Sequence, residues 1–147
     1  MDVIVMSHPD DSSRVAIITP SGELPMDEII QRQVDTTKPY KVMSSKDLPS
    51  QEDDYFEAWQ LANDEIIVNV NKAKDIHRRM LRQQRTERFT SLDISFIRAI
   101  EQGDVSKQQE IAIIKQKLRD LPNHPAIEAA TTTSELRLLT VDTLLTM

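Results

Sequence analysis

The residue types that most often do chemistry in proteins are sparse and scattered in this chain. Its three histidines, His8, His77 and His124, lie far apart, and none has a second ligand at the spacing of a helical metal motif. It has no cysteine, which excludes disulfides, thiolate metal sites and thiol nucleophiles. We therefore predict no catalytic residue, no metal site and no cofactor, and we expect a protein that is not an enzyme.

The glycines and the acidic residues also provide no motif for catalysis or for binding a cofactor or metal. The two glycines, Gly22 and Gly103, are too far apart to form a dinucleotide-binding motif, a P-loop or a nucleophile elbow. The acidic runs Asp10-Asp11 and Glu52-Asp53-Asp54 lack the alternating ligands and central glycine of an EF-hand loop. We interpret both runs as solvated loops.

A basic stripe is one candidate for binding. Residues 1–70 hold 14 acidic and five basic residues, whereas residues 71–147 hold ten acidic and 13 basic residues. The stripe recurs at helical spacing and comprises Lys74, Arg78, Arg82, Arg85 and Arg88. It predicts either an anion surface for nucleic acid or a helix face that is solvated or paired with the acidic first half of the chain. We expect the isolated carboxylate of Asp93 to cap a helix or to bond Arg98 or Arg119.

Two apolar clusters could bind a partner or complete a core. Three of the six aromatic residues, Tyr55, Phe56 and Trp59, lie within five positions, as in interface anchors and in small cores. Leucines are concentrated near residue 147: Leu136, Leu138, Leu139, Leu144 and Leu145. They could cover the chain's own helices or dock on another chain. The candidate partner-binding residues are Tyr55, Phe56, Trp59, Arg78, Arg82, Arg85, Leu136 and Leu139.

The first 70 residues have the pattern of a small antiparallel β module. Residues 3–6 and 15–18 are β-branched runs joined by turn formers, and residues 40–43 alternate like a half-buried strand. Residues 56–61 and 66–70 predict a second hairpin around Asn63-Asp64, with Phe56 and Trp59 on opposite sides. A short helix is expected over residues 27–33.

Residues 71–147 have the pattern of a helical module. We predict a long helix over 72–102, a helix over 105–121 and a short helix over 134–140. Gly103 is placed to end the first helix and to join two apolar stripes into an αα-hairpin. The stripes are Phe89, Leu92, Phe96 and Ile100 on the first helix and Ile111, Ile114, Leu118 and Leu121 on the second. Thr90 is the point at which the long helix would break, if it does. The fold class is therefore α+β: a small antiparallel β module, then a long helix, an αα-hairpin and a short helix.

Several runs of residues resemble a group of small proteins encoded among the tail and tail-fibre genes of tailed bacteriophages. They are residues 55–59 (YFEAW), 71–78 (NKAKDIHR), 92–104 (LDISFIRAIEQGD) and 115–120 (KQKLRD). The resemblance covers nearly the whole chain and is most specific over residues 92–120. It implies a role in tail or tail-fibre assembly and supplies no catalytic motif.

Together these observations favour a non-enzymatic bacteriophage tail protein that binds tail or tail-fibre proteins. It would act as an assembly chaperone or as an adaptor or decoration subunit in the virion. Nucleic-acid binding or regulation through the basic stripe is the alternative, although the net charge of −6 makes nucleic acid an unfavoured partner. The apolar stripes of the predicted hairpin could also bind a second copy of the chain and form a homo-oligomer. Apolar runs of at most four residues exclude a membrane span, so we expect the host cytoplasm during assembly, or the virion tail.

Overall fold

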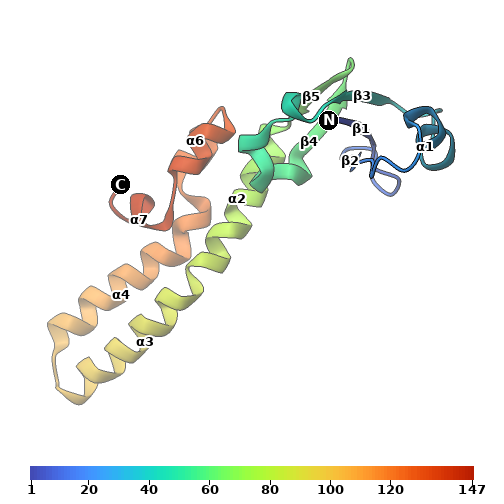
Figure 1. Ribbon diagram of the computed structural model, residues 1–147. Coiled ribbons are helices and arrows are strands. Elements are labelled where there is room, and N and C mark those ends of the chain that lie inside the picture. Colours follow the sequence, from blue (N-terminus) through green and yellow to red (C-terminus); the bar gives the residue numbers. More distant parts are fainter. The chain divides into compact units, whose positions relative to one another are not determined.

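The structure is a computed structural model that describes residues 1–49 and 54–147 in full, and it confirms the α+β class (Figure 1). The chain divides into two units, Met1–Ala73 and Lys74–Met147, so the division falls three residues later than the predicted one after residue 70. The acidic run predicted at Glu52-Asp53-Asp54 lies mostly outside the described residues.

Unit 1 is built on a three-stranded antiparallel sheet of order β2-β1-β3. The strands are β1 (Asp2–Ser7), β2 (Val15–Ile18) and β3 (Tyr40–Ser44), in a register that sets Val5 opposite both Ile17 and Lys41. Successive side chains of a strand point to opposite faces. Val3 and Val5 therefore join Trp59 in one core cluster, while Ile4 packs with Ile29 of α1 (Met26–Gln33) in another.

The second hairpin of unit 1 is shorter than predicted. Strands β4 (Trp59–Ala62) and β5 (Glu65–Val68) pair across Asn63 and Asp64, whose φ angles of 51° and 62° suit a tight hairpin turn. The 3₁₀ segments η1 (Ser45–Asp47) and η2 (Ser50–Ala58) precede β4, so the strand predicted from residue 56 begins only at Trp59. The strand predicted to reach residue 70 ends at Val68, because the Asn69 side chain accepts the Lys72 N–H and caps the next helix.

The long predicted helix is two helices, α2 (Val70–Gln84) and α3 (Thr86–Glu101), which meet at Arg85 rather than at Thr90. Helical hydrogen bonding continues across the junction, since the Arg85 N–H donates to Leu81 O at 3.0 Å and the Phe89 N–H donates to Arg85 O at 3.1 Å. The Thr90 hydroxyl donates back to Thr86 O, which is a mid-helix bond and not a cap.

A Schellman motif ends α3, as the position of Gly103 predicted. Gly103 has φ +65°, its N–H donates to Ile100 O at 3.0 Å, and the Asp104 N–H donates to Ala99 O at 2.9 Å. The Asp104 side chain then caps α4 (Val105–Asp120) by accepting the Lys107 N–H. Helices α3 and α4 pack side by side as an αα-hairpin (Figure 1).

The segment after α4 is more helical than predicted. It contains η3 (Leu121–Asn123), α5 (Pro125–Ala129), α6 (Thr133–Leu138) and α7 (Val141–Leu145). The single helix predicted over residues 134–140 is wrong at its end, because Thr140 starts α7 with a capping box shared with Thr143. Ile127, Leu136, Val141 and Leu144 are buried and supply much of the core of unit 2.

Candidate functional site

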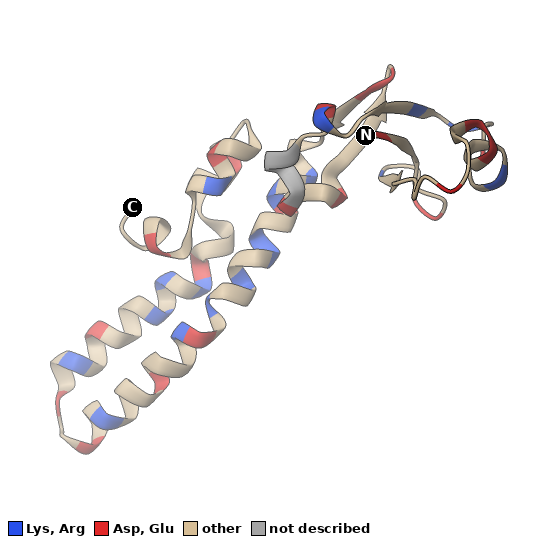
Figure 2. Cartoon of the chain, viewed as in Figure 1, with Lys and Arg blue, Asp and Glu red and all other residues tan. Residues whose placement is uncertain are grey.

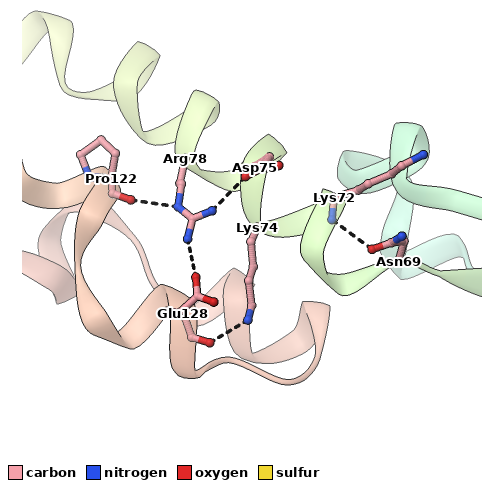
Figure 3. Close-up of polar contacts among 7 residues, drawn as sticks. All are labelled: Asn69, Lys72, Lys74, Asp75, Arg78, Pro122 and Glu128. Atoms are coloured by element: carbon pink, nitrogen blue, oxygen red, sulfur yellow. Dashed lines mark hydrogen bonds and ion pairs between the residues drawn. The ribbon is translucent and has the colours of Figure 1, made fainter.

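The basic face of α2 is turned toward the backbone of unit 2. Lys74, whose side chain is buried, donates from Nζ to the backbone oxygen of Glu128 at 2.7 Å (Figure 3). Glu128 lies in the last turn of α5, where carbonyls have no partner within the helix. A buried ammonium without a partner would be costly, so this bond ties α2 to the end of α5.

Arg78, one turn further along α2, joins three groups. Its Nε donates to Pro122 O at 3.1 Å, and its two terminal nitrogens bind the carboxylates of Asp75 at 2.9 Å and Glu128 at 2.8 Å (Figure 3). The Arg78 side chain is only 22% exposed, whereas both carboxylates are largely in solvent. The guanidinium therefore holds η3 and α5 against α2.

His77 makes an equivalent contact with a more distant part of the chain. Its Nε2 lies 2.7 Å from Leu139 O, between α6 and α7, and the residue is buried. A neutral ring with the hydrogen on Nε2 donates to that oxygen. Burial lowers the pKa of His77, and the bond to Leu139 opposes this only in part. The ring therefore stays neutral near pH 7 as a structural donor.

Arg85, at the junction of α2 and α3, caps a helix of the same unit. One of its terminal nitrogens donates to Leu118 O at 2.8 Å and to Arg119 O at 3.0 Å, in the last turn of α4. A cation suits the partial negative charge of a helix C-terminus. The guanidinium also lies 5.5 Å from the centre of the Phe89 ring, and burial, followed by repulsion from Arg82, lowers its pKa.

Most members of the stripe therefore bind groups of unit 2, and neither an anion surface nor pairing with the acidic first half of the chain describes them. Lys74, Arg78 and Arg85 are occupied by carbonyl oxygens, and Arg88 pairs with Asp142 of α7. In the described part of the chain, Arg82 is the member of the stripe left in solvent. Figure 2 shows Lys and Arg along α2 and on both helices of the hairpin, mixed with Asp and Glu.

The aromatic cluster is core rather than interface. Tyr55 and Trp59 are 1% and 2% exposed, which leaves no surface for a partner. Phe56 packs on the Trp59 ring edge to face, with centroids 5.1 Å apart. The prediction that Phe56 and Trp59 point to opposite sides is wrong, because residues 56–58 are 3₁₀ and do not alternate as a strand does.

The leucines near residue 147 divide between core and surface. Leu136 is fully buried and Leu139 is half-buried, so both complete unit 2 instead of lying open to a partner. Leu138 is the exception, with 72% of its surface exposed. Leu136 therefore covers the chain's own helices and is not available to dock on another chain.

The hairpin of α3 and α4 carries exposed apolar residues that are not among the predicted partner-binding residues. The two helices pack through Ala99, Ile111 and Leu118. Six further aliphatic side chains on the hairpin are 39–61% exposed: Ile94, Ile97, Ile100, Val105, Ile113 and Ile114. Ile100 and Ile114 belong to the predicted core stripes, but they are 52% and 39% exposed, so the prediction that they are buried is wrong. The sequence feature that could have predicted this exposed surface is the number of isoleucines, which is larger than one packed stripe can bury.

Polar groups elsewhere serve local structure. Asp93 binds Lys115 of α4 at 2.5 Å, and not Arg98 or Arg119 as expected. His8 and His124 each accept a backbone N–H two residues ahead through Nδ1, at 3.1 Å. Among the residues that the structure describes, no three histidines or carboxylates are grouped as a metal site would require.

Comparisons of the chain with protein-family models, curated proteins and solved structures find no match. Within the described residues, no helix has the length and apolarity required to cross a bilayer. The candidate functional surface is therefore defined by geometry alone, and it is the exposed hairpin of α3 and α4.

Proposed function

We propose that this protein is a non-enzymatic bacteriophage tail protein that binds tail or tail-fibre components through the α3–α4 hairpin. The observation that carries the proposal is the set of six exposed aliphatic side chains on that hairpin. Apolar surface of this kind on a single chain is typical of a protein interaction site. The runs of residues that resemble phage tail proteins are most specific over residues 92–120, which are the same two helices.

Two versions of this function differ in where the protein ends up. As an assembly chaperone, it shields apolar tail or fibre surface in the host cytoplasm and then leaves. As an adaptor or decoration subunit, it stays in the virion tail. In both versions the hairpin is the contact surface, and the hydrogen bonds of Lys74, His77 and Arg78 hold the short helices that complete unit 2.

Quantitative mass spectrometry of purified, salt-washed phage particles separates the two versions. Several copies per particle would support the adaptor, and abundance in the infected-cell lysate without copies in particles would support the chaperone. Affinity capture with the Ile97→Glu variant beside the unaltered chain then tests the hairpin. Tail or fibre proteins captured equally by both chains, or by neither, would contradict the proposed surface.

Nucleic-acid binding through the basic stripe is the weaker alternative, because three of its nominated residues bind carbonyl oxygens. Binding through phosphates would weaken steeply as salt rises. The absence of DNA or RNA binding at about 50 mM salt would eliminate this alternative. Binding that is lost in Arg82→Gln would favour it over the tail-protein proposal.

A further inference from the structure

Strand β3 is an edge of the three-stranded sheet of unit 1, because that sheet has the order β2-β1-β3. The Ser7 N–H donates to Pro39 O at 3.1 Å, and the Ser45 N–H donates to Met1 O at 2.8 Å. Bonded pairs alternate with non-bonded pairs along an antiparallel ladder, so the odd-numbered residues of β3 bond to β1. The N–H and C=O of Val42 therefore point away from β1, at the free edge of the sheet.

Strand β5 is an edge of the two-stranded sheet, and the same reasoning applies to it. The Asn69 N–H donates to Ala58 O at 2.8 Å, one pair beyond the end of the β4–β5 ladder. In that register the bonded residues of β5 are Glu65 and Ile67. Ile66 lies between them, so its N–H and C=O point away from β4.

A groove of about 560 Å³ lies between these two free edges, and Val42 and Ile66 both line it. Within the described residues, the outward backbone groups of Val42 and Ile66 have no hydrogen-bond partner. Met43 also lines the groove, and it packs with Ile66 against the core cluster around Trp59. A strand edge with unpaired backbone groups beside an apolar groove is the feature to which extended peptides add as a further strand.

The charge of the groove indicates what kind of segment fits it. Its described lining residues include three exposed carboxylates, on Asp47, Asp64 and Glu65, and one cation, Lys41. Residues 1–73, which form unit 1, contain 14 acidic and six basic residues. Two copies of this acidic unit would repel each other, so charge disfavours a second copy of the chain and favours a basic partner.

We infer that this groove binds an extended segment of another protein in which basic and apolar residues alternate. The segment adds to the free edge of β3 and bonds the outward N–H and C=O of Val42. Successive side chains of a strand point to opposite sides. Apolar side chains of the segment can therefore cover Met43 and Ile66, while its basic side chains reach the carboxylates of the groove.

NMR titration of the full chain with a synthetic peptide of about six residues, alternating lysine with valine, tests the inference. Amide signals of β3 and β5 should shift, and hydrogen exchange at the Val42 amide should slow, because that N–H gains a bond. A matched peptide that alternates glutamate with valine should bind at least about tenfold more weakly, because its charges repel those of the groove.

Two variants place the peptide in the groove. Val42→Pro removes the outward N–H and spares the bonds to β1, since proline is tolerated where a strand N–H faces outward, and it should weaken binding about tenfold. Glu65→Lys should weaken binding about three- to tenfold. Its matched control is Glu23→Lys, at an exposed residue of unit 1 that does not line the groove, and this variant should bind like the unaltered chain. Circular dichroism checks that each variant is folded.

Absence of peptide binding up to about 1 mM overturns the inference, and so does equal binding of the two peptides. Shifts confined to residues outside β3 and β5, or equal weakening by Glu65→Lys and Glu23→Lys, overturn the assignment of the groove. The groove belongs to unit 1 and the α3–α4 hairpin to unit 2, so Ile97→Glu should bind the peptide like the unaltered chain. Failure of peptide binding and failure of tail-protein capture are therefore separate results.

Discussion

Replacing Arg78 with methionine removes the most connected contact of unit 2 while keeping an apolar stem of similar length. The bond from Nε to Pro122 O joins a charged donor to a neutral acceptor, and such bonds contribute about 1.5–3 kcal/mol. The carboxylates of Asp75 and Glu128 are 79% and 74% exposed, so solvent screening limits each ion pair to less than about 1 kcal/mol. We expect Arg78→Met to lower the free energy of unfolding by about 2–3 kcal/mol.

Urea unfolding followed by circular dichroism at the helix band measures this loss. With a slope of about 1–3 kcal/mol per molar urea, the midpoint should fall by on the order of 1 M. Arg82→Met is the matched control, because Arg82 is exposed on the same helix, and it should change stability by less than about 0.5 kcal/mol. Fluorescence of Trp59, the single tryptophan, reports unit 1 in the same samples. Equal losses of stability in Arg78→Met and Arg82→Met would refute the role given to the Arg78 contacts.

Three further predictions concern single residues of unit 2. Burial lowers the pKa of His77 below its usual 6.5, so the unfolded chain takes up a proton first, and stability falls as pH drops from about 6.5 toward the folded-state pKa. His77→Gln should flatten that pH dependence in urea titrations, and an unchanged slope would contradict it. Gly103→Ala meets no atom within 4 Å but imposes a side chain at φ +65°, so thermal unfolding should show a loss of about 1–2 kcal/mol, and no loss would argue against the left-handed turn. Leu118→Ala, at a fully buried position, should cost about 2–5 kcal/mol, whereas Ile113→Ala at an exposed position should cost much less, and similar costs would contradict the hairpin packing.

Local sequence patterns predicted the parts of this fold that depend on neighbouring residues. The β-branched runs at 3–6 and 15–18 became paired strands, because the turn formers between them return the chain within a few residues. Gly103 ended α3 in a Schellman motif, since a residue without a Cβ adopts positive φ at little cost. Thr140 was missed as a cap because it lies inside a leucine-rich run that reads as one helix.

The candidate surface was harder to predict, because apolar periodicity does not tell which apolar side chains become buried. Ile100 belonged to the predicted core stripe, yet the helices contact through Ala99, one position away. Two helices have only one mutual contact line, so an isoleucine-rich hairpin must expose the rest. Which isoleucines remain exposed depends on the rotation of each helix about its axis, and that is set by packing.

The sequence by itself determined the α+β class, the hairpin of two helices and the absence of glycine-rich and cysteine-based motifs. All of these follow from propensity, spacing and composition. Only the tertiary structure decided what the basic face of α2 does. The carbonyls that Arg78, Lys74 and His77 bind lie 44, 54 and 62 positions further along the chain. Every residue has a backbone carbonyl, so these acceptors leave no mark in the sequence, and only the folded chain shows which of them a donor side chain reaches.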